Sequence, residues 1–254
     1  GLAITPKKLL KVDKVYRKAY QEKKLNNSMI NISSTMSAAI DLWGQMYENK
    51  APWIKKEVIS LGMAESIASE FARLITLEME SSITGSVRAD FLDGHYQKVL
   101  KVLREQIEYG CAYGGIIIKP YISQDGIDFD YVQADSFVPL VFGSDGRLKS
   151  CVFMEQLKKF GSVYTRFEVH ESNLEGVRIL NHAYKSKDEY TTGHEVSLSE
   201  VDEWRGIAED VFIEGVKEPL FGYFKVAGAN IVDKKSPLGC SVFASSTDTS
   251  LQLY

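Results

Sequence analysis

Apolar residues recur every three or four positions through most of residues 1–112, and this spacing predicts a series of amphipathic helices. We expect a first helix over 6–24 and a second one from the N-cap candidates at 33–35 to about residue 48. A fourth helix is predicted over 88–110. The third begins at Met63, and we expect it to be buried on one side through Ile67, Phe71, Leu74, Ile75 and Met79.

Three glycines stand between the fourth predicted helix and a strand over 116–121. A phosphate-binding turn places its glycines before a helix, where free N–H groups and the positive dipole end converge. Here they follow the helix C-terminus, whose free carbonyls repel anions. We therefore favour a structural role over a ligand site, with Gly110 ending the helix in the left-handed conformation and Gly114 and Gly115 allowing close backbone approach.

Beyond Gly115 the period of the apolar pattern changes to two, which predicts strands. The dipeptide Asp125-Gly126 separates strands over 116–122 and 127–132, and Asp145-Gly146 separates strands over 137–142 and 148–153, so each dipeptide predicts a tight hairpin. Further strands are expected over 58–61, 163–169, 177–183, 211–216 and 220–226, with a short helix over 200–207 and a mobile polar loop over 185–193.

These elements together predict an α+β fold in which N-terminal helices pack with a largely antiparallel, meander-rich β region. We expect a single body over 1–254, with a mainly helical part over 1–112, a mainly β part over 113–235 and a last segment over 236–254 that opens another element. An element that has barely begun at Tyr254 indicates a fragment, and Gly1 in place of methionine is typical of a cleaved tag.

Composition and charge narrow the classes of function. The 254 residues are 44% hydrophobic and 25% charged, a composition that is ordinary for a globular protein. The formal net charge of −4 argues against a protein whose whole surface binds nucleic acid. We expect a soluble, intracellular protein, because the chain lacks the run of about 20 apolar residues of a membrane span and a signal peptide's apolar core.

Lysines at helical spacing give the first predicted helix a basic face. A solvated surface is the favoured explanation, and contact with DNA or an acidic partner is the alternative. The candidate contact residues are Lys7, Lys11, Lys14 and Lys18.

The sequence assigns no catalytic, metal-binding or cofactor-binding residue. It contains no nucleophile elbow, phosphate-binding loop or dinucleotide fingerprint. Cys111, Cys151 and Cys240 are too widely spaced for a metal or redox motif, and we expect reduced core thiols. The histidines at 95, 170, 182 and 194 are scattered; His170 and His182 lie on neighbouring predicted strands, where a facing pair is more often structural than metal-binding.

Two carboxylates leave an enzymatic alternative open. Asp128 and Asp130 are two residues apart on a predicted strand and therefore share a face, as the ligands of a metal-dependent nuclease require. A solvated hairpin edge is the favoured explanation of this pair. A third alternative is a soluble α+β module that binds a peptide or a small ligand.

Several segments, taken in order, resemble the portal proteins of long-tailed bacteriophages of Gram-positive hosts, in the portal or minor-capsid family that also occurs in prophages. Each segment is degenerate alone, and the specificity lies in the ordered set. The matching segments are Ile40-Asp41-Leu42-Trp43-Gly44-Gln45-Met46-Tyr47 with Ala51-Pro52-Trp53, the junction 106–119, Val132-Gln133-Ala134-Asp135-Ser136-Phe137-Val138-Pro139, Pro219-Leu220-Phe221-Gly222-Tyr223-Phe224 and Ser236-Pro237-Leu238-Gly239.

The resemblance implies a structural protein that is not an enzyme and needs no cofactor. Portals of this family form a ring, dodecameric in the family, at one vertex of the virion capsid, and double-stranded DNA is packaged and ejected through it. The implied partners are other copies of the chain, the terminase motor, scaffold and major capsid proteins and head-tail connector proteins, with assembly in the bacterial host cytoplasm. The chain then covers the N-terminal wing-like body, and the stem, clip and crown would follow Phe243.

The charge and the geometry of a ring agree with this expectation. A channel through which DNA slides cannot hold phosphates tightly, so a mildly acidic subunit suits it. A closed ring needs heterologous interfaces, in which one surface meets a different surface of the neighbour. We therefore expect exposed apolar patches on two faces of the body, with the loop over 185–193 and the basic helix as further contacts.

Overall fold

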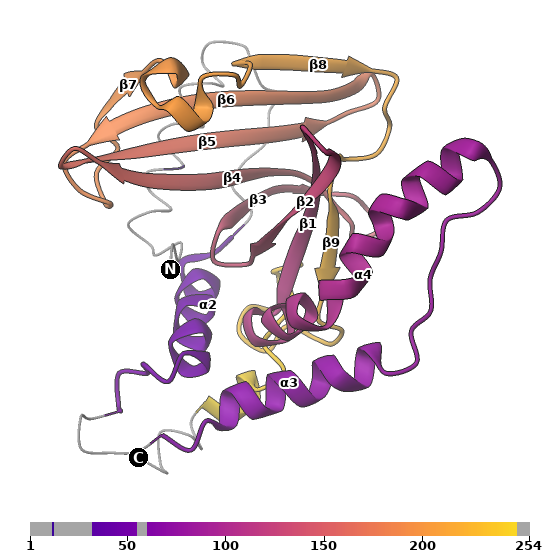
Figure 1. The fold of residues 1–254 in the computed structure, drawn as a ribbon. Helices are drawn as coiled ribbons and strands as arrows, with labels where there is room; N and C mark the ends of the chain where they lie inside the picture. The colour runs from indigo at the N-terminus through magenta and orange to yellow at the C-terminus, as the bar shows by residue number, and fades with distance from the viewer. Residues whose placement is uncertain (1–11, 13–31, 55–59, 248–254) are drawn as a thin grey trace. The chain divides into compact units, whose positions relative to one another are not determined.

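The computed structural model describes residues 12, 32–54 and 60–247, and this part of the chain has the predicted α+β fold. Helices come first and antiparallel strands follow (Figure 1). The helix expected over 6–24 lies outside the described residues except for Val12, which is helical and buried, and most of the strand expected over 58–61 lies outside them too. Among the described helices, none has the length and apolarity that crossing a bilayer requires.

The chain divides into two compact units, each built from two segments. Unit 1 comprises residues 1–38 and 135–220, and unit 2 comprises residues 39–134 and 221–254. The change from helices to strands falls near residue 113, as expected, but the unit boundaries do not follow it. The single body expected over 1–254 stays a prediction.

Unit 2 holds α3 (Met63–Thr76), α4 (Val87–Tyr113) and most of α2 (Ser34–Tyr47). The bounds of α2 and the start of α4 confirm the predicted helices. Ser86 caps α4, because its hydroxyl accepts a hydrogen bond from the backbone N–H of Ala89 at 3.2 Å. The Tyr47 hydroxyl at the end of α2 donates to Glu108 of α4 at 2.7 Å.

The contact between α3 and α4 corrects the predicted burial of the third helix. The buried residues of α3 are Ala64, Ala68 and Ala72, which form one stripe at a spacing of four. Small side chains let the helices approach closely, so the larger apolar residues flank the contact. Phe71, Leu74, Ile75 and Met79 are exposed, and Ile67 is half-buried.

The end of α4 corrects the predicted role of Gly110. This glycine lies inside the helix, where an added Cβ would come within 2.9 Å of the Phe224 ring, so it allows close packing. Gly114 is the left-handed C-cap, with φ of 85°. The helix therefore runs three residues beyond Gly110, because Cys111, Ala112 and Tyr113 add buried surface to its last turn.

A three-stranded antiparallel sheet completes unit 2, in the order β2-β1-β9. The strands β1 (Gly115–Ser123) and β2 (Gly126–Gln133) form the first predicted hairpin, with Gly126 at φ of 109°. The predicted strand β9 (Gly222–Lys225) pairs with the start of β1 rather than with the preceding strands. The short η3 (Ala244–Ser246) follows near the end of the described chain.

Unit 1 is built on a six-stranded antiparallel sheet in the order β3-β4-β5-β6-β7, with β8 paired to β6 (Figure 1). The Asp145-Gly146 hairpin and the meander are confirmed. In place of the short helix expected over 200–207 there are two 3₁₀ turns, η1 (Leu198–Glu200) and η2 (Asp202–Trp204). The strands are β3 (Phe137–Phe142), β4 (Leu148–Lys159), β5 (Ser162–Ser172), β6 (Gly176–Ser186), β7 (His194–Val196) and β8 (Asp210–Glu214).

Both faces of this sheet are covered. On one face a cluster around Phe167 and Leu180 includes the helical residue Val12. On the other face Trp204 and Val201, from the η1–η2 turns, pack against Tyr164. The central strand β5 is consequently buried along both of its faces, which holds the β4–β5–β6 meander as a rigid platform.

Candidate functional site

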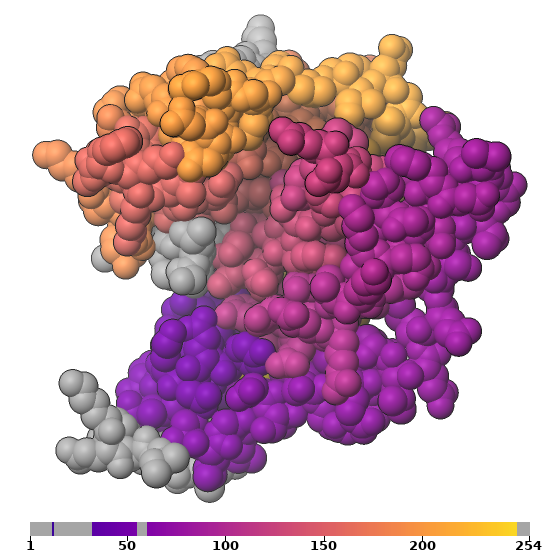
Figure 2. All heavy atoms as spheres, in the orientation of Figure 1, coloured from indigo at the N-terminus to yellow at the C-terminus, as the bar shows by residue number. Residues whose placement is uncertain are grey.

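Exposed apolar side chains concentrate on α3, the segment after it and the first turns of α4, all within unit 2. We call this set the apolar surface. In Figure 2 the first turns of α4 lie open at the surface of the molecule. The members are Leu61, Met63, Phe71, Leu74, Ile75, Leu77, Met79, Ile83, Val87, Phe91 and Leu92.

The residues of the apolar surface are between 36% and 87% exposed. Together these half-exposed side chains leave on the order of 1,000 Å² of apolar area open, distributed over α3, the segment after it and the first turns of α4. On α3 the positions Met63, Phe71 and Leu74 lie beside the buried alanine stripe, so the apolar face of that helix is only half covered. A surface of this kind is suited to docking another protein surface.

A second exposed feature is the tip of the β4–β5 hairpin in unit 1. Lys159 pairs with Ser162, so the loop consists of Phe160 and Gly161 alone. Their φ angles are 49° and 73°, which defines a type I′ turn. Phe160 is 99% exposed and carries a side chain that the left-handed region disfavours. Phe160 therefore combines backbone strain of about 1 kcal/mol with a solvent-exposed aromatic ring.

Phe160→Asn is expected to stabilise the protein by about 0.5–1 kcal/mol, because asparagine adopts the left-handed conformation readily and no buried contact is lost. The temperature of thermal unfolding should rise by about 1–4 °C. The matched control is Leu174→Asn, at a hairpin tip that is 95% exposed and has no positive φ. A rise of equal size in the control would show that the hydrophobicity of the tip, rather than its backbone, sets the effect.

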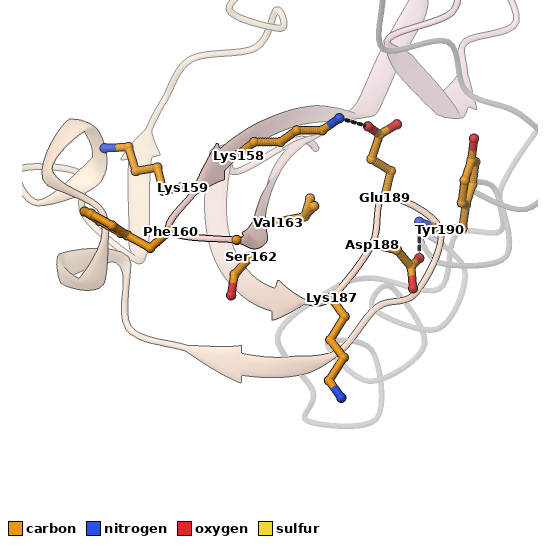
Figure 3. A pocket seen from close by; sticks show the side chains of 10 residues that line it. Lys158, Lys159, Phe160, Ser162, Val163, Lys187, Asp188, Glu189 and Tyr190 are labelled. Carbon is orange, nitrogen blue, oxygen red and sulfur yellow. Dashed lines mark hydrogen bonds and ion pairs between the residues drawn. The ribbon is translucent and has the colours of Figure 1, made fainter.

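A hollow of about 470 Å³ lies beside this tip, between the hairpin and the loop after β6 (Figure 3). Lys158 reaches across it to form an ion pair with Glu189, while Phe160 points away from it. The loop over 185–193 was expected to be mobile, yet the Asp188 carboxylate accepts hydrogen bonds from the backbone N–H groups of Tyr190 and Thr191, both at 2.8 Å. Of the charged groups that line the hollow, Lys158 and Glu189 thus pair with each other, whereas Lys159 pairs with Glu203 outside it.

A buried polar network lies on the Trp204 side of the unit 1 sheet. The Arg166 guanidinium donates to Glu155 at 2.9 Å from Nη2, and to Glu168 and Asn181 at 2.9 Å each from Nη1. The Trp204 indole N–H donates to the same Glu155 oxygen at 3.1 Å. These bonds tie β4, β5, β6 and η2 together.

The strand register also corrects the expectation that His170 and His182 face each other. His170 lies opposite Ile179 and His182 lies opposite Phe167, so the two rings are on opposite faces of the sheet. His170 contacts Glu168 at 2.6 Å, and His182 contacts Glu195 at 3.0 Å. Among the residues that the structure describes, no group of three or more His, Cys, Asp or Glu side chains is placed to hold a metal ion.

The two carboxylates of the nuclease alternative do share a face of β2, but each faces a lysine. Lys98 contacts Asp128 at 3.0 Å, and Lys119 contacts Asp130 at 3.5 Å. A hydrogen bond from Ser123, followed by the ammonium of Lys98, holds the pKa of Asp128 below its usual value. The pair is an ion-paired hairpin edge with no third carboxylate gathered beside it among the described residues.

The remaining predicted site residues separate into two groups. Lys7, Lys11, Lys14 and Lys18 lie outside the described residues. The three cysteines are free, and Cys111 and Cys151 are buried as expected, whereas Cys240 is only half-buried. Burial raises the pKa of the Cys111 thiol to about 11, which keeps it protonated and unreactive at neutral pH.

The signal for the apolar surface was present in the sequence. The apolar period over 63–79 marks its residues correctly, but it does not distinguish side chains that pack inside the unit from those that face outward. A scan against models of known protein families finds no match to this chain, and a search of curated proteins finds none either.

Proposed function

We propose that this chain is a structural subunit of a phage portal, which assembles into a ring for the passage of double-stranded DNA. The proposal rests on the ordered resemblance of segments from Ile40 to Gly239 and on the apolar surface, which is the structural observation that carries it. A subunit that functions by binding other copies needs exposed apolar surface, and unit 2 has such surface on its helices.

The size of the apolar surface suits a permanent contact. A standard protein interface buries about 800 Å² on each partner, and the exposed apolar area on α3 and α4 is of that order. Ring closure requires a heterologous contact, so this surface would meet a different surface of the neighbouring copy. The formal net charge of −4 is compatible with a channel that lets DNA slide.

The alternatives gain no comparable support. The nuclease alternative depends on Asp128 and Asp130, whose carboxylates are each engaged by a lysine. The ligand-binding alternative depends on a cavity, and the hollow beside the β4–β5 hairpin is crossed by the ion pair between Lys158 and Glu189. The apolar surface remains the feature that internal contacts do not account for.

Leu74→Glu tests the proposal in the last turn of α3, where the Leu74 side chain is 56% exposed. The change should leave the fold intact, because it touches no buried position, and should weaken self-association at least about 100-fold by placing a charge in an apolar contact. Ser69→Glu adds the same charge on the polar side of α3 and serves as the control. Sedimentation velocity over a concentration series and negative-stain microscopy provide the measurement.

Rings in the wild-type protein that vanish with Leu74→Glu and persist with Ser69→Glu would support the proposal. Monomers of the wild-type protein at every concentration would contradict it. Rings that tolerate both substitutions would show that assembly uses another surface.

A further inference from the structure

We propose that the Phe160 side chain of one copy inserts into an apolar pocket in unit 2 of a second copy. The inference rests on the proposed self-assembly and specifies one contact within it. In the proposed ring this contact is heterologous, because the hairpin tip of one copy meets a different surface, the pocket, of the next copy.

The hairpin tip is built as a rigid knob. The β4–β5 ladder is regular from the pair Cys151 and His170 to the pair Lys159 and Ser162, directly beside the turn. Lys158 forms an ion pair with Glu189, and Lys159 forms one with Glu203. The two strands next to the tip are therefore held by ion pairs to other segments of unit 1. A stiff hairpin loses little conformational entropy when its tip docks.

The exposure and the backbone conformation of Phe160 at the tip are also energetically unfavourable in an isolated subunit. Phe160 is 99% exposed, and its φ of 49° suits glycine or asparagine better than phenylalanine. Figure 3 shows the ring pointing away from the neighbouring loop, toward solvent. Nothing among the described contacts of unit 1 accounts for an aromatic residue here, whereas burial by another copy would.

Unit 2 contains a pocket whose size and lining match this knob. The pocket has a volume of about 270 Å³ and lies between α3 and the segments before and after Ser236. A cavity of about 150 Å³ is enough to hold a benzene ring, so a phenylalanine side chain fits with room for the pocket to close around it. The lining residues are mainly small or apolar, among them Phe71, Val226, Ala229, Ile231, Val242 and Ala244.

The pocket is continuous with the apolar surface. Phe71 belongs to both, since it is 45% exposed on α3 and also forms a wall of the pocket. An aromatic knob seated there would extend the apolar contact of α3 across its neighbouring segments. Aromatic anchors in such pockets commonly dominate the affinity of an interface.

Native Cys240 lines the pocket and provides a direct test. In a Phe160→Cys variant, held at about 100 times the concentration at which the wild-type protein assembles so as to offset the loss of the phenyl ring, mild oxidation with copper phenanthroline is expected to join Cys240 to the new thiol of another copy, giving a ladder of covalent multimers on a non-reducing gel. Cys111 and Cys151 should not compete, because both are buried. The controls are Phe160→Cys combined with Cys240→Ser, and Leu174→Cys, which places a thiol on the other exposed tip of the same meander.

The expected result is at least about 10-fold more covalent multimer for Phe160→Cys than for either control. A second measurement uses Phe160→Asn, which is expected to raise the temperature of unfolding while weakening self-association about 10- to 100-fold. A variant that folds better but assembles worse cannot be explained by misfolding.

The outcomes separate this contact from assembly itself. Wild-type rings with no cross-link to Cys240 and with unchanged assembly of Phe160→Asn would overturn the contact and leave the proposed function standing. Wild-type monomers throughout the concentration range would overturn both. A ladder that persists when Cys240 is replaced by serine would also overturn the assignment of the pocket.

Discussion

Gly114→Ala is expected to lower the free energy of unfolding by at least about 3 kcal/mol. The residue has φ of 85°, which alone costs alanine about 1 kcal/mol. An added Cβ would also lie 2.5 Å from the carbonyl oxygen of Gly239 and 2.9 Å from its carbonyl carbon. Both are backbone atoms, so the clash cannot be relieved by turning a side chain.

The matched control for this prediction is Gly62→Ala in the same unit. Gly62 has φ of 63°, and its added Cβ would meet only a Glu65 carboxylate oxygen at 3.8 Å, an ordinary contact. We expect the control to lose about 1 kcal/mol, from the backbone conformation alone. Urea unfolding followed by far-ultraviolet circular dichroism measures both variants. Equal losses would mean that the junction between α4 and β1 tolerates the added group.

Arg166→Met is expected to lower the free energy of unfolding by about 3–4 kcal/mol, because it leaves the buried Glu168 carboxylate without the Arg166 cation. The Arg166 side chain is 14% exposed and that of Glu168 is 12% exposed, so solvent replaces little of the lost interaction. Asn181 loses a donor at the same time. The methionine keeps most of the aliphatic volume, so the loss reports the charge and its hydrogen bonds rather than a cavity.

Arg178→Met provides the control on the neighbouring strand β6. Arg178 pairs with Asp210 at 2.6 Å, but the two side chains are 33% and 42% exposed. An ion pair in that setting contributes about 0–1 kcal/mol. Chemical denaturation of both variants should therefore separate them clearly. A loss at Arg166 as small as that at Arg178 would show that water relaxes into the network.

The hairpins were predictable from sequence because their signal is local. Asp125-Gly126 and Asp145-Gly146 supply the backbone conformation that a tight turn needs, and the flanking alternation sets the strands. The turn at Phe160 was not singled out, because phenylalanine is not a typical residue of a type I′ turn. A local rule fails at the one hairpin tip for which we propose a docking role.

Burial was less predictable than secondary structure. The spacing of Phe71 and Leu74 is that of a buried face, yet alanines make the contact and these residues stay open. On β5, Arg166 and Glu168 lie on the same face as Tyr164, and Trp204 of η2, more than thirty residues later, covers that face. Periodicity records which residues share a face and carries no information about which distant segment covers it.

The pairing of β9 with β1 delays completion of this sheet while the chain folds on the ribosome. Gly115 of β1 pairs with Lys225 of β9. This edge of β1 therefore stays unpaired until more than one hundred further residues have been translated. At about 5–20 residues per second the delay is roughly 5–20 s. During that interval the backbone N–H and C=O groups beside Ile116 and Ile117 form an open edge, and a nascent chain in this state is a natural client for chaperones.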